Sequence, residues 1–363
     1  MTKYGIPKNI KEVSPEWLSE VLAPQHGAGI KIHDVEIVNV FEGTSSRIRV
    51  RIERNEAAIA AGIPEYLCVK ANWTEHADFT MVAGLWAIEA MFYQRIRPHI
   101  DMLAPVAYYS DYDSVSGQGI ILMEDLVQKN VTFGSNLNTL SVDQLMLALE
   151  DFAALHARWW GSEDLMKMDW LPLAQGEGTL DAEFVNFQGG AEGMARLLAP
   201  PERAATLSAQ ANDAEKIAKV VDALVQREAS STAPRCLIHG DTHLGNSYWV
   251  DGRMAWLDWQ LVRRGRPIRE VFYVIGCSLS VEDRRKHERD LLKHYLSALN
   301  AHGVDHGMSF DDAWLEYRHW PVWGFICWAV TQDGWQPKEV ILETMRRFGA
   351  AIDDLETYSL FGL

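Results

Sequence analysis

The sequence predicts an α+β protein of two parts, a small N-terminal lobe built on an antiparallel β-sheet and a larger, mainly helical C-terminal lobe. Stretches in which apolar and polar residues alternate, as in half-buried strands, are concentrated in the first third of the chain. Apolar residues at helical spacing, preceded by residues that commonly cap helices, dominate the remainder. We therefore expect an N-lobe over residues 1–125 and a C-lobe over residues 126–363.

The N-lobe contains several strand-like stretches. They lie at residues 32–41, 47–52, 66–73, 103–109 and 119–123. The polar turn 42–46 joins the first two, which predicts a hairpin. Apolar residues at helical spacing predict one helix over residues 77–97, and Pro98 ends it. The N-lobe is therefore expected to be mostly sheet, with a single helix.

The C-lobe carries repeated helix-start signals. Ser141 and Gln144 have the spacing of a capping box and predict a helix that continues to Trp159. A short strand at residues 235–238 and a hairpin over residues 248–257 are also expected. Further helices are predicted over residues 214–226, 280–301, 309–330 and 337–356.

Composition excludes several classes of function. The net charge of −16, from 34 basic and 50 acidic residues, disfavours binding to nucleic acid or to an anionic membrane. No stretch approaches the roughly 18 consecutive apolar residues of a membrane span, and the N-terminus lacks the apolar run of a signal peptide, so a cytoplasmic protein is expected. The four cysteines form no C-x-x-C pair and the histidines no H-E-x-x-H, so transition-metal catalysis is not expected.

One polar segment has the spacing of a phosphoryl-transfer site. Asp241 is followed five residues later by Asn246, and Asp258 comes twelve residues after that. One carboxylate can accept the proton of an acceptor hydroxyl, while an amide oxygen and a second carboxylate are the ligands that Mg²⁺ prefers. We assign Asp241 the first role and Asn246 and Asp258 the second. The alternative is that Asp241 only caps a turn beside Gly240.

Four motifs carry a resemblance to a known family. They are His239-Gly240-Asp241-x-His243-x-Gly245-Asn246, Leu257-Asp258-Trp259-Gln260, Glu124-Asp125-Leu126 and Leu155-His156-Ala157-x-x-Trp160. With them the chain resembles the aminoglycoside phosphotransferase and choline kinase superfamily, in its ecdysteroid-kinase-like branch. The resemblance implies a two-lobed protein-kinase-like fold and a small-molecule kinase. Such an enzyme uses Mg²⁺ and ATP, with GTP left open as the alternative, and phosphorylates a hydroxyl group.

The resemblance also implies residues that bind the nucleotide. Lys70, on the third expected strand, would hold the α- and β-phosphates, and Glu89 on the following helix would brace it. The alternative is a solvent-facing lysine and an unrelated glutamate. The turn containing Gly43, Thr44, Ser45 and Ser46 occupies the position of a phosphate-covering loop, although an ordinary hairpin turn is the alternative. Met123, Glu124 and Leu126 would border adenine through main-chain groups.

The chain departs from its relatives in places. Trp259 and Gln260 stand where protein kinases have Phe-Gly, so we expect no protein substrate. Members of the family often carry an Asp where this chain has Arg269-Glu270, and no role is assigned to Glu270. The basic run at residues 263–266 is expected to be a solvated loop, and the alternative is that it offsets phosphate charge. His239 and His243 are expected to brace the catalytic loop rather than react.

The acceptor is the least determined part of the reaction. Residues 161–210 and 310–335 are the candidates for its binding site, and the second segment is rich in Trp. These aromatic rings favour a partly apolar hydroxylated small molecule. A cage for a quaternary ammonium group and simple core packing are the alternatives. A non-catalytic module that binds a nucleotide or small molecule on the same scaffold is the alternative function.

Overall fold

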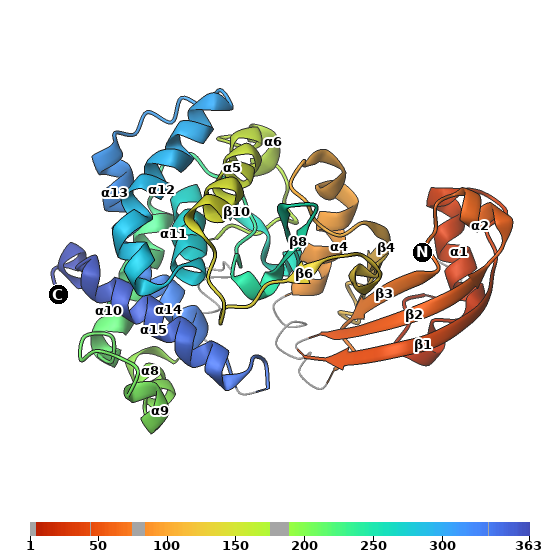
Figure 1. Cartoon of the computed structure of the whole chain (residues 1–363), viewed down its shortest axis with the longest axis horizontal. Coiled ribbons are helices and arrows are strands. Elements are labelled where there is room, and N and C mark those ends of the chain that lie inside the picture. Colours follow the sequence, from red (N-terminus) through yellow and green to blue (C-terminus); the bar gives the residue numbers. More distant parts are fainter. Residues whose placement is uncertain (1–4, 44, 75–83, 175–188, 333) are drawn as a thin grey trace. The chain divides into compact units, whose positions relative to one another are not determined.

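The computed structural model describes residues 5–43, 45–74, 84–174, 189–332 and 334–363 (Figure 1). The chain divides into two compact units. The first comprises Met1–Thr132 together with Leu257–Leu261, and the second comprises Phe133–Trp256 and Val262–Leu363. The first unit thus extends beyond residue 125 and includes a short segment from much later in the sequence, which contains Asp258.

The first unit is built on a five-stranded antiparallel sheet, which confirms the sheet expected in the N-lobe. Its strands follow the order β1-β2-β3-β5-β4. Their bounds are β1 Ile32–Glu42, β2 Ser46–Arg54, β3 Tyr66–Ala71, β4 Ala107–Tyr112 and β5 Gly119–Glu124. The central strand β3 pairs with β2 and β5, so that Lys70 lies opposite Arg47 on one side and Ile121 on the other.

Within the described part of this unit there are three α-helices, where one was expected from the sequence. They are α1 (Pro15–His26), α2 (Glu56–Ala60) and α4 (Leu85–Arg95). Ser14 caps α1 by accepting the Trp17 N–H, and the apolar face of α1 is buried in the same core as the sheet, alongside β1 and β2 in Figure 1. The predicted helix over 77–97 corresponds to α4, and residues 77–83 lie outside the described part of the chain. Short 3₁₀ turns occupy Ile10–Glu12, Arg97–His99 and Leu126–Gln128.

The second unit is mainly helical, as predicted. The helices in its described residues are α5 (Val142–Arg158), α6 (Glu163–Met166), α8 (Gly190–Leu198), α9 (Pro201–Ala204), α10 (Ala214–Ala229), α11 (Pro267–Ser278), α12 (Val281–Ala301), α13 (Phe310–Arg318), α14 (Pro321–Ala329) and α15 (Lys338–Asp354). The capping box of Ser141 and Gln144 is formed at the start of α5. The single helix predicted over 309–330 is wrong, because α13 ends at Arg318 and Pro321, which lacks an N–H, begins α14.

Helix α11 lies at the centre of this unit. Every one of its residues is buried, and α5, α12, α13, α14 and α15 all contact it (Figure 1). A 3₁₀ turn over Thr357–Phe361 follows α15. Among the described residues, no helix is both long and apolar enough to cross a membrane.

Two small sheets complete the second unit. Strands β7 (Cys236–Ile238) and β10 (Arg263–Gly265) pair antiparallel, and β8 (Ser247–Val250) forms a hairpin with β9 (Arg253–Trp256). β6 (Thr132–Phe133) is next to β8 in the sheet order. Because β10 is a buried strand, the expectation of a solvated loop over 263–266 is wrong.

Candidate active site

The predicted catalytic loop follows β7 directly and brings two of the predicted site residues together. Asn246, in the 3₁₀ turn Leu244–Asn246, donates its side-chain N–H to Asp241 Oδ2 at 2.9 Å and to the Asp241 carbonyl at 3.1 Å. The amide nitrogen of Asn246 is thereby committed to Asp241. Its amide oxygen is the atom type that a hard cation such as Mg²⁺ prefers.

Two glycines allow the tight course of this loop. Gly240 has φ = +87°, which side-chain-bearing residues rarely adopt. A Cβ on Gly245 would lie 2.8 Å from His243 Cε1, closer than non-bonded atoms approach. The ring of His243 therefore lies against the backbone at Gly245, and its Nε2 is 3.7 Å from Asp241 Oδ2. This position agrees with a bracing role for His243.

Glu270, to which the sequence analysis gave no role, holds the start of the catalytic loop. Its carboxylate accepts the N–H of Gly240 at 2.7 Å, the N–H of His239 at 3.2 Å and His156 Nε2 at 2.9 Å. The other ring nitrogen of His156 lies 2.8 Å from the Tyr295 hydroxyl. Burial alone would raise the pKa of Glu270, but the hydrogen bond and charge of His156, with further help from His239 and Gly240, lower it.

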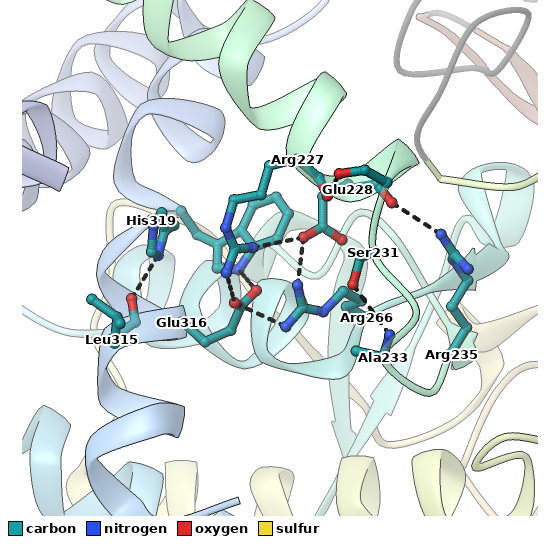
Figure 2. A network of polar contacts seen from close by, with 11 residues as sticks. Arg227, Glu228, Ser231, Ala233, Arg235, Arg266, Leu315, Glu316 and His319 are labelled. Carbon is teal, nitrogen blue, oxygen red and sulfur yellow. Dashed lines mark hydrogen bonds and ion pairs between the residues drawn. The ribbon is translucent and has the colours of Figure 1, made fainter. Parts of the chain in front are cut away.

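A buried network of ion pairs anchors the residue that precedes α11. Figure 2 shows Arg266 between two glutamates, with 2.7 Å to Glu228 Oε1 and 2.9 Å to Glu316 Oε2. Arg227 bridges the same two carboxylates at 3.0 and 2.6 Å. Both glutamates are buried, so each needs these cations to offset the loss of water. The network fixes the start of the helix that carries Glu270, which gives Arg266 a structural role in place of solvation.

In the first unit, the buried residues Lys70 and Glu89 form a cluster with Asp258, which is partly exposed. Lys70 Nζ lies 2.8 Å from Glu89 Oε2 and 3.0 Å from Asp258 Oδ1. The sequence-based pairing of Lys70 with Glu89 is therefore present, and the alternative of a solvent-facing lysine is wrong. Asp258 has φ = +59°, an uncommon backbone conformation for a residue other than glycine. The ring of Trp259 stacks on Phe92 of α4, with centroids 4.1 Å apart, and so holds the segment that carries Asp258.

The charges in this cluster shift one another's pKa. Burial would lower the pKa of Lys70, but the carboxylates of Asp258 and Glu89 outweigh it and raise the pKa. Burial raises the pKa of Glu89 to about 7, with Lys70 opposing the rise and Asp258 adding to it. One ammonium group thus faces two carboxylates, and the more deeply buried carboxylate takes up a proton more readily than an exposed glutamate.

The predicted phosphate-covering turn is partly described. Gly43 N donates to the Ser45 carbonyl at 3.2 Å, and the Thr74 hydroxyl donates to the Gly43 carbonyl at 2.9 Å. The Ser46 hydroxyl donates to Glu42 Oε2 at 2.8 Å. Thr44 lies outside the described residues. The role of this turn in phosphate binding stays a prediction.

The predicted adenine-binding segment lies at the end of β5. Met123 pairs with Cys68 and Glu124 with Leu67 of β3. The Glu124 N–H donates to the Val106 carbonyl at 2.9 Å, so this amide is already committed within the unit. Leu126 begins the 3₁₀ turn Leu126–Gln128, which Asp125 caps.

Comparison with known proteins identifies the family. The model of the ecdysteroid kinase-like family matches residues 44–306, well over half of the chain. The chain belongs to this family. No curated protein sequence matches it significantly.

This ecdysteroid kinase-like protein also shares its fold with solved structures of low sequence identity. A Plasmodium vivax ethanolamine kinase is 12% identical, with a TM-score of 0.51 over 87% of this chain and 81% of the other. A spectinomycin phosphotransferase in complex with ADP and spectinomycin is also 12% identical, with a TM-score of 0.51 over 94% and 98%. A choline kinase from Cryptosporidium parvum is 11% identical, with a TM-score of 0.50 over 90% and 88%. These similarities confirm the two-lobed protein-kinase-like fold.

A small pocket of the ecdysteroid kinase-like protein lies beside the catalytic loop. It has a volume of about 10 Å³, close to the space that one water molecule needs, and is lined by Ile238, Gly240, Thr242, Arg269, Glu270, Tyr273 and Trp323. Two of these residues, Gly240 and Thr242, flank Asp241 in the sequence. The Thr242 hydroxyl is buried, and the described part of the chain gives it no hydrogen-bond partner. The pocket thus places a polar group and an aromatic ring next to the predicted catalytic carboxylate.

The Trp-rich segment 310–335 contributes mainly to the core. Trp320 and Trp328 are almost fully buried, and Trp320 Nε1 donates to Glu316 Oε1 at 3.2 Å. Trp323 alone of the segment lines the pocket among the described residues. The guanidinium of Arg269 lies 4.3 Å from the Trp323 ring centre and 5.5 Å from that of Trp320. These two rings therefore already contact a cation of the protein itself, which argues against a quaternary ammonium cage here.

Proposed function

We propose that this ecdysteroid kinase-like protein transfers the γ-phosphoryl group of ATP to a hydroxyl group of a small molecule, with Mg²⁺ as cofactor. The observation that carries the proposal is the cluster of buried Lys70 and Glu89 with partly exposed Asp258, which joins side chains from distant parts of the sequence at 2.8–3.0 Å. Burying the charged groups of Lys70 and Glu89 is costly, so such a cluster is expected where function requires it. Membership of a kinase-like family and the shared fold with small-molecule kinases support the same reaction class.

Each residue has a role in this proposal. Asp241 orients the acceptor hydroxyl and accepts its proton; because phosphoryl transfer is mainly a matter of positioning, an ordinary carboxylate suffices. The oxygens of Asn246 and Asp258 fit Mg²⁺, which when bound neutralises charge on the β- and γ-phosphates. Lys70, held by Glu89, binds the α- and β-phosphates.

The remaining nucleotide contacts are proposed from the sequence. Gly43, Thr44, Ser45 and Ser46 cover the phosphates, and main-chain groups of Met123, Glu124 and Leu126 border the adenine. These assignments extend the family resemblance, and substitution of single residues can test each of them.

The acceptor is proposed to be a partly apolar, hydroxylated small molecule. The relatives named above are called ethanolamine kinase, choline kinase and spectinomycin phosphotransferase, so small hydroxylated acceptors are typical of the fold. In this chain Arg269 covers the faces of Trp320 and Trp323 with its own positive charge. A second cation at these rings would be repelled, which favours a neutral acceptor over choline.

The proposal can be tested in two steps. Thermal unfolding is measured with and without Mg²⁺ and ATP for the wild type and for Asp258→Asn. A ligand at about a hundred times its Kd adds roughly 2.7 kcal/mol of stability, so we expect a magnesium-dependent rise in Tm that the variant loses. ADP release is then measured with a panel of neutral and cationic hydroxylated acceptors, with Asp241→Asn as the control. Nucleotide binding without turnover on any acceptor would favour a non-catalytic module.

A further inference from the structure

Tyr273 lies between the core of the second unit and the predicted catalytic carboxylate. It is a buried residue of α11, and its hydroxyl is 3.4 Å from Asp241 Oδ1. Asn246 and His243 approach the other oxygen of the same carboxylate. Each oxygen of Asp241 thus has its own protein partner.

The direction of the hydrogen bond at Tyr273 is determined by a second residue. Trp328 Nε1, on α14, lies 3.1 Å from the Tyr273 oxygen. An indole N–H can only donate, so the tyrosine oxygen must accept from Trp328. The single proton of the phenol is then left for Asp241, whose ionised carboxylate can only accept. The three groups therefore form a chain that runs from Trp328 through Tyr273 to Asp241.

Packing holds this chain in place. The Tyr273 ring stacks on Phe348 of α15, with centroids 5.4 Å apart and planes 27° apart. The Trp328 ring meets His243 of the catalytic loop edge-on at 5.1 Å. Burial and the nearby charge of Asp241 raise the pKa of the Tyr273 hydroxyl well above its ordinary value, so it stays a neutral donor. Neither aromatic ring can rotate away without opening the core.

We propose that Tyr273, oriented by Trp328, is a positioning residue that fixes the Asp241 carboxylate in the orientation needed to receive the acceptor hydroxyl. This inference rests on the proposed function and adds to it residues that none of the sequence motifs contain. Because Tyr273 also lines the pocket beside Gly240 and Thr242, it connects the orientation of Asp241 with the place where the acceptor is expected. A freely rotating carboxylate would meet the hydroxyl in the correct geometry only part of the time.

The test compares the effect of removing the Tyr273 hydroxyl with the effect of removing a matched tyrosine hydroxyl elsewhere in the second unit. Tyr273→Phe keeps the ring and loses the donor, and we expect kcat to fall roughly 10- to 100-fold, the loss typical of a hydrogen bond to a charged group, while the KM for ATP is unchanged. Tyr317→Phe is the control, because the Tyr317 hydroxyl also donates to a buried carboxylate, Glu288, at 3.3 Å. This control should lower Tm about as much as Tyr273→Phe and leave kcat unchanged.

A double substitution distinguishes positioning from stability. Trp328→Phe should lower kcat because the phenol loses the group that orients it, and Tyr273→Phe combined with Trp328→Phe should be no slower than Tyr273→Phe alone. If the fold-losses in kcat of the two single variants multiplied in the double variant, the two residues would act independently, and the proposed chain of hydrogen bonds would be wrong. A kcat for Tyr273→Phe equal to that of the wild type would overturn the positioning role and leave the proposed function intact.

A spectroscopic measurement separates this inference from the proposed function. In ¹⁵N spectra of the indole groups, the Trp328 resonance, identified with Trp328→Phe, should move in Tyr273→Phe and in Asp241→Asn but not in Tyr317→Phe. If it moves as expected while the wild type transfers no phosphate to any acceptor, the proposed function fails and the positioning role fails with it. A Trp328 resonance that is unchanged in both variants would show that the hydrogen bonds linking Trp328, Tyr273 and Asp241 are not formed, whether or not the protein is active.

Discussion

The carboxylate of Glu270 accepts the backbone N–H of Gly240 at 2.7 Å. Gly240 immediately precedes Asp241, so a side chain of α11 sets the position of the predicted catalytic residue through the main chain. The same carboxylate also receives the His239 N–H and the His156 ring. Three donors therefore hydrogen-bond to one buried carboxylate, and Glu270 holds the start of the loop in place.

Replacing Glu270 with Gln should destabilise the second unit and slow turnover. The amide keeps the shape but loses the charge to which three donors bond, and we expect the free energy of unfolding to fall by about 2–4 kcal/mol. Urea unfolding followed by circular dichroism would measure it. The control is Glu282→Gln, at an exposed position near the start of α12. Equal stabilities of Glu270→Gln and the wild type would contradict the role given to Glu270.

The loss of folding stability caused by Glu270→Gln should depend on pH. The folded pKa of Glu270 is lowered, so the stability that the ionised group contributes is present above its unfolded pKa and is lost as the pH falls through the lower folded value. The stability difference between the wild type and Glu270→Gln should therefore be constant near neutrality and shrink in acid. Urea unfolding of both proteins at a series of pH values from 7 downward would measure this difference in stability. A difference that grew in acid would contradict the lowered pKa of Glu270.

Glu89→Gln should show the opposite dependence on pH. The pKa of Glu89 is raised to about 7, so the folded protein binds a proton at Glu89 more tightly than the unfolded chain does. The stability gained from this tighter proton binding is fully present below the pKa of Glu89 in the unfolded chain, and it is lost as the pH rises through about 7. The stability of the wild type relative to Glu89→Gln should therefore decrease between pH 5 and pH 8. Exposed Glu36→Gln serves as the control, with a flat difference expected.

Lys70→Met should reduce turnover by about two orders of magnitude, as expected when a charge that stabilises the transition state is lost. The substitution also leaves Glu89 and Asp258 without the ammonium group between them. ADP release at saturating ATP measures the effect. Lys129→Met is the matched control, since Lys129 pairs with Glu124 of the same unit but is half exposed. Similar losses in the two variants would argue against a specific role for Lys70.

Trp320 and Trp323 should respond differently to truncation. Trp320 is buried in the core, so Trp320→Ala should cost about 3–5 kcal/mol of stability. Trp323 lines the pocket, and Trp323→Ala should raise the KM for the acceptor more than the KM for ATP. Steady-state kinetics with each substrate varied in turn, together with Tm, would separate the two effects. Unchanged acceptor kinetics in Trp323→Ala would exclude this pocket from acceptor binding.

Features that are local in sequence could be predicted. The β1–β2 hairpin, the capping box at Ser141 and the pairing of Asp241 with Asn246 each depend on residues within a few positions of one another. Helix α1 was also predictable, because Ser14 and Pro15 are start signals and Trp17, Leu18, Val21 and Leu22 form an apolar face, but it was missed. The break before α14 likewise had a signal in Pro321.

Features that depend on tertiary contacts could not be predicted. Glu270 meets His156 across 114 positions of sequence, and nothing near either residue specifies the other. Two consecutive arginines, Arg263 and Arg264, are typical of a surface, yet they lie in a buried strand because β10 pairs with β7. The location of Trp323 in a pocket and of Trp320 in the core depends on how α14 and the residue before it pack against α11. Charge and aromatic content alone do not contain that information.

Helix α11 carries, on one face, Glu270 and Tyr273, with Arg266 just before its first turn. Arg266 and Glu270 are four residues apart, and Glu270 and Tyr273 are three apart, so the three side chains lie on the same side of the helix. A single inserted or deleted residue within α11 would rotate part of this face by about 100° and separate the ion-pair network, the loop brace and the Asp241 contact from one another. The length of α11 is therefore constrained in a way that the length of a surface loop is not. Because α11 is also the buried centre of its unit, heat or denaturant should abolish turnover and melt the core in one transition.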